Sequence, residues 1–556
     1  MRRIVHRLPG IRSVVGAIRL RENSLKAADS LVDRLLDVYR PLLGDATCVR
    51  TVLVPASSTL VVAISEDESE TLSVGDRIVW GTPVGDQGEA SEDEIDRAIT
   101  DPVVARGLMG VYVLIAVETS KVSMVTSAAL PKTLLRVDGP NGSALATKGL
   151  AGQILAGVAP NMSEEVIADF VVFGFPVGDD ELLSRTVVEE ATAAEFTDTG
   201  LRIRSYWPPE ERLAPGPPTT PGRLREVLGS TVGRMSQVPG VRLALTAGRD
   251  SSLVAACLND RGRIVESFTL GSADSDDGAG AARTARLLGW SHHAVPIGQR
   301  RPPDEFAEIV RWAPWHEGMQ RAWDYAASWL DWDVRDLFYV GGHGGEIGRS
   351  FYGAGNDDAL SVLARRMSFV TPRTAAVVRD RIGHVLDDLR AIGRPDADLL
   401  DLFYAKYRAR HLFIRFAPFP QFRSFVTPYL EPGVVSALLD APVAKRDGSL
   451  FDETLESISP QLRVHNTRRA HVSQGRLARR IARWRAGRTP ALRSLRRCIA
   501  SADEAPYVAS VLGAEWWSRA MAGARRGDGF WFWRLWNALA VESLHVRFRL
   551  AANDKR

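Results

Sequence analysis

Apolar and β-branched residues alternate or run together in several short segments of the first quarter of the chain. The clearest segments are residues 51–54, 59–64, 110–117 and 121–125. Runs of this length and composition are typical of β-strands. The region from about Arg50 to Val137 is therefore predicted to form a sheet domain.

The pattern changes after residue 222, where helical and strand segments take turns. The expected order is helix 223–236, strand 241–245, helix 251–260, strand 265–270 and helix 278–288. Such alternation predicts a parallel, doubly wound sheet, which binds its ligands beyond the carboxyl ends of the strands. From about Asp357 onward the pattern is mostly helical.

A proline-rich stretch separates the two patterns. Residues 207–222 contain six prolines, which can continue neither a helix nor a central strand. We therefore predict a first domain at residues 1–207, a linker at 208–222 and a second domain at 223–556. Two domains also suit a chain of 556 residues, which exceeds the usual size of a single core.

The composition is that of a folded globular protein. Hydrophobic residues make up 45% and charged residues 25% of the chain, which excludes the disordered and fibrous classes. No apolar stretch approaches the roughly 18 residues of a membrane span, and the start lacks a signal-peptide core, so a cytoplasmic protein without membrane contact is expected. The three cysteines are far apart and form neither a disulfide framework nor a zinc-binding pair.

The net charge of +3 is small, but the charges are unevenly distributed. Acidic residues gather at 66–70 and 89–96, whereas residues 468–497 contain many arginines and no acid. The basic segment could bind nucleic acid, an acidic carrier protein or peptide, or anionic lipid, or it could be a solvated surface. A nucleic-acid partner is considered unlikely. The tryptophan-rich residues 530–536 are expected in a core or an interface.

The turn between strand 241–245 and the helix that follows is the strongest candidate for chemistry. Its backbone N–H groups and the positive end of the helix would meet at one point, which suits a phosphate group. Gly248 would allow close approach of the backbone, and Asp250 could hold Mg²⁺. A tight turn with a helix-capping aspartate is the alternative.

Three segments resemble motifs of the asparagine synthetase family, which includes β-lactam synthetases and lasso-peptide cyclases. Residues 246–251 resemble its Ser-Gly-Gly-x-Asp-Ser pyrophosphate loop, residues 277–293 its Ala-Ala and His-His segment, and residues 342–352 its second ATP-site loop. Pro428-Tyr429-Leu430-Glu431 is a weaker match to a fourth motif. The resemblance implies an N-terminal αββα sandwich of the Ntn type, similar to a class II glutamine amidotransferase domain, and a C-terminal ATP-pyrophosphatase domain with helical additions.

The resemblance also implies residue roles. Mg²⁺ would be held by Asp250 and Glu346. The ATP-binding residues would be Leu245, Thr246, Ala247, Gly248, Arg249, Asp250, Ser251, Ser252, Leu270, Gly341 and Gly342, with Leu270, Gly341 and Gly342 at the adenine.

This chain departs from the family at several positions. His343 replaces an acidic residue and stands at the catalytic tyrosine position of the β-lactam synthetases, where a base could deprotonate an attacking amine; a histidine merely tolerated in a glycine-rich loop is the alternative. The family lysine that stabilises the acyl-adenylate transition state has no equivalent, because no lysine lies between Lys445 and Lys555. Lys445 or Arg446 is expected to supply the charge, unless other arginines do so.

The first domain is expected to lack glutaminase chemistry. The family's nucleophile is an N-terminal cysteine, whereas residue 2 is Arg2 and the nearest cysteine is Cys48. Residues 126–131 lack the family's Arg-Asp pair, and Lys148 stands where the family has glutamate. β-lactam synthetases and many lasso-peptide cyclases show the same loss.

The expected activity is formation of an amide bond with ATP through an acyl-adenylate, releasing AMP and pyrophosphate, without glutamine and in natural-product biosynthesis. The substrate would be a small molecule or peptide with a carboxylate and an amine, with a pathway partner protein or a homodimer possible. Two alternatives stay open: ammonia-dependent amidation like that of asparagine synthetase, and a non-catalytic protein that binds a peptide or partner.

Overall fold

The computed structural model describes most of the chain. The described residues are 4–8, 13–21, 28–43, 47–65, 71–159, 162–179, 186–295, 305–317, 337–353, 358–411, 422–464, 507–526 and 528–553. The acidic segment 66–70, the basic segment 468–497 and Cys498 lie outside these ranges.

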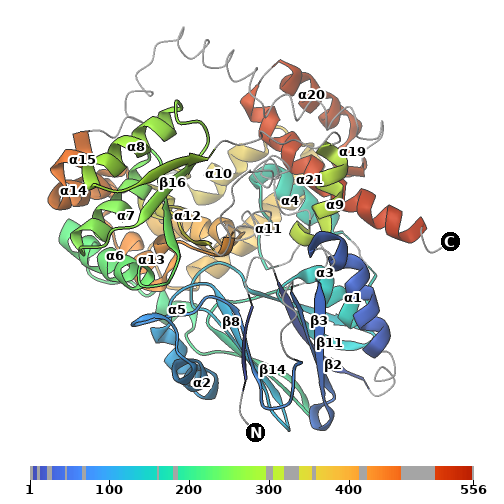
Figure 1. Cartoon of the computed structure of the whole chain (residues 1–556). Coiled ribbons are helices and arrows are strands. Elements are labelled where there is room, and N and C mark those ends of the chain that lie inside the picture. The colour runs from blue at the N-terminus through green and yellow to red at the C-terminus, as the bar shows by residue number, and fades with distance from the viewer. Residues whose placement is uncertain are drawn as a thin grey trace.

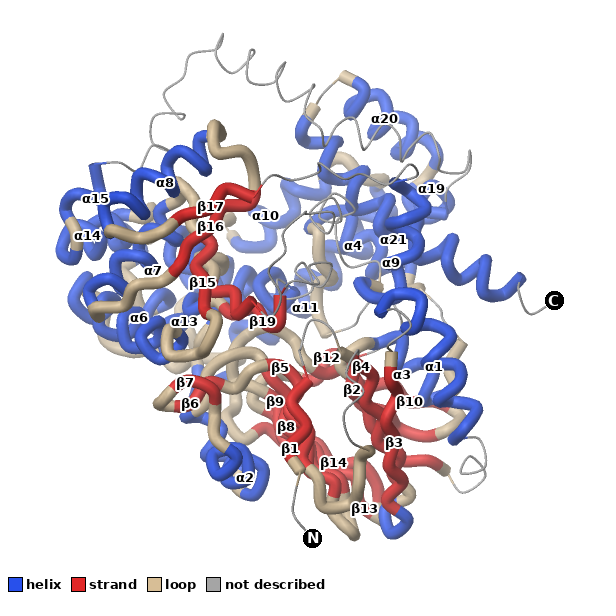
Figure 2. The backbone as a smooth tube through the Cα atoms, in the orientation of Figure 1, coloured by secondary structure: helices blue, strands red, loops and turns tan. Residues whose placement is uncertain are grey.

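The first two hundred residues form two six-stranded sheets that lie face to face (Figures 1 and 2). The first sheet has the order β1 (Val5–Leu8), β5 (Arg77–Gly81), β8 (Tyr112–Val117), β9 (Val122–Thr126), β13 (Thr192–Thr197) and β14 (Gly200–Ser205). The second has the order β12 (Thr186–Val188), β10 (Leu134–Gly139), β11 (Gly142–Ala146), β2 (Val14–Leu20), β4 (Thr59–Ser65) and β3 (Cys48–Val54). β1 and β5 are parallel, and the other neighbours in both sheets are antiparallel. A small ribbon, β6 (Val84–Gly85) and β7 (Gly88–Glu89), completes this part.

The core of the sandwich lies between the sheets. Side chains from both meet there, such as Val15 and Val61 from the second sheet with Ile78 and Ile115 from the first. The outer face of the first sheet packs against α2 (Glu92–Thr100), and that of the second against α1 (Ala28–Leu43) and α3 (Gly149–Ala156). This four-layer arrangement confirms the predicted αββα fold class.

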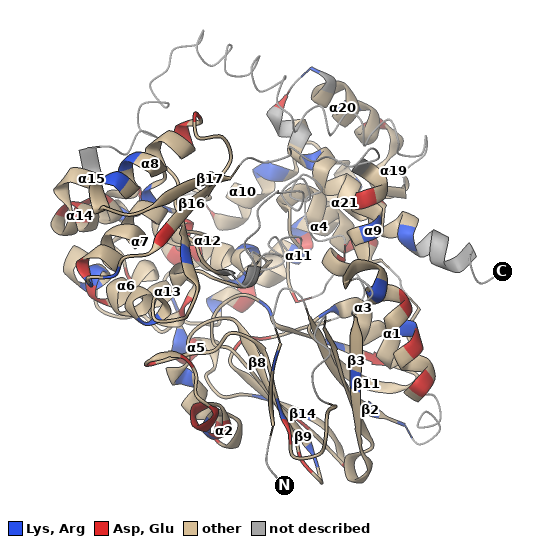
Figure 3. Cartoon of the chain, viewed as in Figure 1, with Lys and Arg blue, Asp and Glu red and all other residues tan. Residues whose placement is uncertain are grey.

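The acidic segment 89–96 stabilises the start of α2. Ser91 and Glu94 form a capping box, in which each side chain accepts a hydrogen bond from the other's backbone N–H. Acidic side chains in a first turn also favour the positive end of the helix dipole. Figure 3 shows these charges on the outer surface of α2.

Outside the sandwich lies a five-stranded sheet that is parallel throughout. Its order is β17 (His292–Val295), β16 (Glu266–Leu270), β15 (Val241–Ala244), β18 (Leu337–Val340) and β19 (Phe422–Val426). The helices α6 (Pro221–Met235), α7 (Arg249–Asp260) and α8 (Asp276–Leu288) alternate with its first strands. The chain builds the sheet outward from β15 in both directions, which confirms the predicted doubly wound fold.

The helices α6 and α8 start about two residues before their predicted positions, because capping side chains extend them. Thr220 caps α6, so this helix begins at Pro221 instead of residue 223. Ser275 accepts a hydrogen bond from the N–H of Gly278 and moves the start of α8 to Asp276.

The remaining helices surround the parallel sheet and connect it to the sandwich. They are α4 (Glu164–Phe173), α5 (Pro209–Arg212), α9 (Glu305–His316), α10 (Ala359–Ala364), α11 (Pro372–Arg390), α12 (Leu399–Phe403), α13 (Pro432–Leu439), α14 (Ser449–Ile458), α15 (Pro460–Val464), α19 (Tyr507–Leu512), α20 (Ala514–Arg525) and α21 (Gly529–Asn553). Trp531 and Trp536 of the tryptophan-rich segment are buried as expected, whereas Trp533 is 40% exposed. Among the described helices, none is long and apolar enough to cross a bilayer.

Hydrogen bonds donated by backbone N–H groups join the sandwich to the segment that follows β19. The N–H of Leu130 donates to the carbonyl oxygen of Leu430 at 3.1 Å, and the N–H of Gly110 donates to Glu431 Oε1 at 2.9 Å. Burial raises the pKa of Glu431 to about 8, although the Gly110 hydrogen bond acts in the opposite direction. The folded protein therefore keeps a proton on this carboxyl at neutral pH.

We expect the Glu431→Gln variant to gain stability relative to the wild type as pH rises from about 4.5 to about 8. In this window the unfolded wild-type chain has lost the Glu431 proton and the folded chain holds it, so wild-type stability falls by up to about 1.4 kcal/mol per pH unit. Glutamine accepts the same hydrogen bond and does not titrate. Urea unfolding across this range measures the difference, and the exposed Glu210→Gln is the control; parallel pH profiles for Glu431→Gln and wild type would contradict it.

Candidate active site

The reversal of strand order places two loops side by side. β15 and β18 are neighbouring parallel strands, and the chain continues from β15 to one side of the sheet and from β18 to the other. The loops that follow these strands therefore leave the same edge of the sheet. In doubly wound folds, ligands bind at this switch point.

Hydrogen bonds within the first loop, residues 245–252, hold it in a tight turn. The hydroxyl of Thr246 accepts from the N–H of Gly248 at 3.0 Å and lies 3.1 Å from Ser251 Oγ. Ser252 Oγ donates to the carbonyl oxygen of Gly248 at 2.8 Å. The serine and threonine side chains of the motif thus fix the backbone that a phosphate would contact. We call this segment the phosphate loop.

The start of α7 is not capped by the side chain of its N-cap residue. Gly248 is its N-cap residue and contributes no side-chain cap to the first turn. N–H groups of a first helical turn carry partial positive charge and bind anions readily. The side chain of Arg249 lies toward α14, where its Nε is 2.7 Å from Asp452 Oδ1.

Ala247 occupies a position where the family usually has glycine, and the structure shows how its methyl group fits. A Cβ atom built on Gly280 of α8 would lie 2.3 Å from the Cβ of Ala247. The methyl group of Ala247 therefore fills space that is available only because residue 280 has no side chain.

The second loop, residues 341–346, packs directly against the phosphate loop. A Cβ atom at Gly342 would lie 2.7 Å from the backbone N of Ser251, and one at Gly345 would lie 2.6 Å from Cγ of Asp250. The glycines of one loop thus admit the backbone and the carboxylate of the other. The structure brings these predicted residues together.

Two carboxylates and one cation occupy the junction of the loops. Arg349 Nη2 lies 2.5 Å from Asp250 Oδ2, and the hydroxyl of Tyr429 donates to the backbone oxygen of Asp250 at 2.9 Å. Glu346 Oε2 accepts hydrogen bonds from Tyr404 Oη at 3.0 Å and from the N–H of Gly344 at 3.2 Å. Burial raises the pKa of Glu346, but hydrogen bonding to backbone and the charges of Arg349 and His343 outweigh this effect and lower it overall. Glu346 is therefore held as a carboxylate.

The donor set fits Mg²⁺ bound together with a nucleotide. Asp250 and Glu346 offer hard oxygen ligands, and the glycines beside them leave room for phosphate groups. Proteins commonly bind Mg²⁺ through one or two carboxylates, while phosphates and waters supply the remaining ligands.

His343 is exposed at the end of β18. Its Nε2 lies 3.2 Å from the hydroxyl of Tyr339, and its ring meets the edge of Phe425 with centroids 5.8 Å apart. Its backbone oxygen accepts a hydrogen bond from Thr427. The exposed ring is thus oriented by neighbouring aromatic side chains.

Leu270 ends β16, beside the phosphate loop. The N–H of Leu245 donates to the carbonyl oxygen of Phe268 at 2.8 Å, and the hydroxyl of Thr269 donates to the carbonyl oxygen of Leu245 at 2.5 Å. These hydrogen bonds connect the ends of the two strands. Gly341 follows β18 and is bound to the neighbouring strand β19, where its N–H donates to the carbonyl oxygen of Val426 at 3.1 Å. The residues expected at adenine therefore lie at the ends of the two strands that flank β15.

The two cations expected to replace the family lysine are engaged elsewhere. Arg446 is buried and paired with Asp398 at 2.7 Å and Asp401 at 3.0 Å. Lys445 pairs with Glu453 at 2.7 Å near the surface. In the described part of the chain, neither contacts the phosphate loop, and the geometry of Arg446 favours a structural role. Arg349 is the cation that meets Asp250.

Sequence reasoning missed both Arg349 and Tyr404. Arg349 lies within the motif at residues 342–352, at a position where the family has phenylalanine. A charged residue at this apolar position could have indicated its role. Tyr404 contacts Glu346 from 58 positions away, and no local pattern indicates that pairing.

Residues 223–326 match the family model described as Asparagine synthase. The segment includes β15, the phosphate loop, α7, α8 and β17, and the match confirms the family resemblance there. It covers less than a fifth of the chain and ends before the second loop. The match supports an ATP-dependent enzyme of the ligase or amidotransferase type.

No curated protein sequence matches the chain significantly. Two solved structures show a weak likeness, each with 10% identity and a TM-score of 0.21. One is described as the allosteric regulatory enzyme of purine biosynthesis. The match to it covers 59% of this chain and 74% of the chain in that structure. The other is glutamine phosphoribosylpyrophosphate amidotransferase from B. subtilis complexed with ADP and GMP. The match to it covers 64% of this chain and 79% of the chain in that structure. A likeness this weak carries no argument.

Proposed function

We propose that this chain is an ATP-dependent ligase that activates a carboxylate as an acyl-adenylate and transfers the acyl group to an amine. The contact between the phosphate loop and the second loop, with Asp250, Glu346 and Arg349 at their junction, is the observation that carries the proposal. An acyl-adenylate route needs charge stabilisation at the phosphates, and this junction concentrates the groups suited to it.

In the first step, an oxygen of the substrate carboxylate attacks the α-phosphorus of ATP. A new C(O)–O–P bond forms, the bond to the β-phosphate breaks, and pyrophosphate leaves. The first turn of α7 and the hydroxyls of Ser251 and Ser252 would hold the leaving pyrophosphate. Mg²⁺ held by Asp250 and Glu346 would supply charge neutralisation.

In the second step, the amine attacks the acyl carbon, the amide bond forms and AMP leaves. The amine must lose a proton, and His343 is the exposed base at the end of β18. We expect His343→Gln to slow amide formation by roughly a hundredfold while the first step is largely retained. Pyrophosphate exchange and amide formation, measured on the same sample, separate the steps; an equal loss in both would argue against the role.

Arg349 is proposed as the cation that replaces the family lysine. We expect Arg349→Met to lower pyrophosphate release by roughly tenfold to hundredfold, because an uncompensated charge then develops on the phosphates. Arg349→Lys should retain part of the activity, because lysine keeps the positive charge but lacks the planar guanidinium group with its paired N–H donors. Arg225→Met removes a surface arginine paired with Asp260 and serves as the control; unchanged release by Arg349→Met would point to another cation.

The sandwich is proposed to contribute structure without glutaminase chemistry. Lys148, at the position where the family has glutamate, is buried and donates to the backbone oxygen of Trp315 at 2.9 Å. Its ammonium group also lies 4.7 Å from the centre of the Trp315 ring. A lysine held in this way links the sandwich to α9.

The proposal is tested by the nucleotide products. The full-length protein is incubated with Mg²⁺, ATP labelled at the α-phosphate and a panel of amino acids and short peptides. Turnover that yields AMP and pyrophosphate supports the acyl-adenylate route, whereas ADP and phosphate as the products would overturn it. Calorimetry with Mg-ATP tests the binding site itself, and absence of binding would favour a non-catalytic role.

A further inference from the structure

Two arginines near the second loop differ from several buried arginines in the charged groups that the described residues place beside them. Arg212, Arg394, Arg410 and Arg446 are buried and pair with carboxylates. Arg366 and Arg408 are half-buried, and within the described residues neither forms an ion pair with a carboxylate. Within the described residues, two positive charges therefore lie close together there without a carboxylate partner.

Both guanidinium groups lie against one exposed aromatic ring. Arg408 Cζ is 4.5 Å and Arg366 Cζ is 5.6 Å from the ring centre of Phe351, which is 36% exposed. Arg366 also lies 4.7 Å from the ring of Tyr352. The rings orient the two guanidinium groups by cation–π contact but do not neutralise their charge. We call Phe351, Arg366 and Arg408 the arginine patch.

Separate structural elements bring the patch together. Arg366 belongs to the short 3₁₀ helix η6 (Arg365–Met367), and Arg408 ends the π-helical turn η8 (Tyr404–Arg408). π-turns interrupt α-helices and occur frequently at functional sites. Like charges on neighbouring elements cost free energy unless an opposite charge lies between them.

The pKa values agree with this geometry. Burial lowers the pKa of Arg366, and the charge of Arg408 lowers it further. A third arginine, Arg534 of α21, stacks on Phe369 at 3.9 Å, and burial together with the charge of Arg366 lowers its pKa to about 10. The local surroundings thus disfavour the positive charges that are present.

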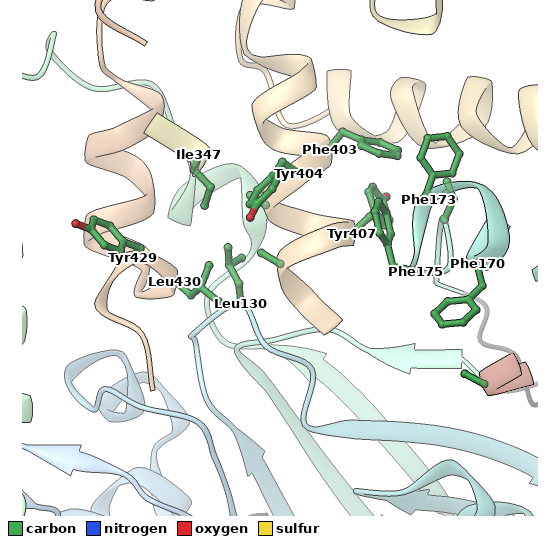
Figure 4. Close-up of a cluster of buried hydrophobic side chains, with 14 of the residues drawn as sticks. Leu130, Phe170, Phe173, Phe175, Ile347, Phe403, Tyr404, Tyr407, Tyr429 and Leu430 are labelled. Carbon is green, nitrogen blue, oxygen red and sulfur yellow. The ribbon is translucent and has the colours of Figure 1, made fainter. Parts of the chain in front are cut away.

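The arginine patch borders the site proposed for ATP. The ring of Tyr404 packs on Phe351 with centroids 5.3 Å apart and lies 5.7 Å from Arg408 Cζ. Its hydroxyl donates to Glu346 at 3.0 Å. One tyrosine side chain therefore spans from the patch to the second loop, and Figure 4 shows it between Ile347, which follows that loop, and the rings of Phe403 and Tyr407.

We propose that Arg366 and Arg408 bind an anionic group, a carboxylate or a phosphate, of the substrate whose other end reaches the ATP site. This inference rests on the proposed function and specifies the substrate class: a molecule with an anionic group besides the carboxylate that is activated. Two guanidinium groups in a partly desolvated setting bind such a group strongly and reject neutral or cationic equivalents.

Site-resolved arginine modification tests the proposal. The full-length protein is treated with phenylglyoxal, and the modification rate of each arginine is followed by peptide mass spectrometry. Saturating Mg²⁺ and a non-hydrolysable ATP analogue occupy the phosphate loop throughout. We expect millimolar succinate or inorganic phosphate to slow modification of Arg366 and Arg408 several-fold relative to chloride of equal ionic strength, and neutral succinamide to have no effect.

Comparison of the two anions identifies the group, since stronger protection by succinate indicates a carboxylate and stronger protection by phosphate indicates a phosphate ester. Arg408→Met should remove the protection of Arg366, while the surface residue Arg390 should be modified at the same rate under all conditions. Equal rates at Arg366 with and without both anions would overturn the inference. Failure of the ATP analogue to bind, measured by calorimetry, would instead overturn the proposed function.

Discussion

Replacing Asp250 with asparagine is expected to lower the rate of pyrophosphate release by at least about a hundredfold. Asp250 lies in the first turn of α7, accepts the ion pair of Arg349 at 2.5 Å and packs against Gly345 of the second loop. Asparagine preserves the shape but removes the negative charge that would hold Mg²⁺ and position the arginine. Release of pyrophosphate from labelled ATP measures the effect.

A matched control lies at the other end of the same helix. Asp260 pairs with Arg225 on the surface, so Asp260→Asn makes the same chemical change far from the phosphate loop. An exposed pair contributes at most about 1 kcal/mol to stability, and this control should keep normal activity. If Asp250→Asn released pyrophosphate at the control rate, Asp250 would have no part in the reaction.

Replacing Gly342 with alanine is expected to weaken ATP binding by roughly tenfold to hundredfold. The added Cβ would lie 2.7 Å from the backbone N and 3.0 Å from the Cα of Ser251. Backbone atoms cannot rotate away from such a contact as a flexible side chain can, so the two loops must separate. The same loops would hold the phosphates.

Calorimetry with Mg-ATP measures the affinity, and thermal unfolding shows whether the fold survives. Gly383 lies inside α11 with no atom within 4 Å of the position of an added Cβ, so Gly383→Ala is a suitable control. Alanine there should be neutral or slightly stabilising, since glycine is unfavourable within a helix. Unaltered ATP affinity in a folded Gly342→Ala protein would exclude the second loop from the binding site.

Local signals made the phosphate loop and its flanking elements predictable. The strand before the loop, the glycine at the turn and the serines that follow it all lie within twelve residues, and the structure shows them close to their expected positions. The second loop was also recognisable, because its glycines are spaced as in the family motif. The starts of α6 and α8 moved to positions set by the capping residues Thr220 and Ser275.

Long-range partners were not predictable in the same way. Arg349 and Asp250 are 99 positions apart, and Arg446 finds its acidic partners 45 and 48 positions earlier. Which arginine meets Asp250 and which belongs to a buried ion-pair network depends on how α12, α14 and the loops pack. A sequence pattern shows the available charges, but only the tertiary arrangement pairs them.

The contact between Ala247 and Gly280 has a consequence for sequence change in this chain. The methyl group of one residue occupies the volume that a side chain on the other would need. Substitutions at the two positions should therefore be strongly non-additive, since a side chain at 280 is tolerable only after residue 247 has become glycine. The divergent phosphate loop and α8 thus form one coupled unit of evolutionary change, in which the order of mutations decides which sequences are reachable.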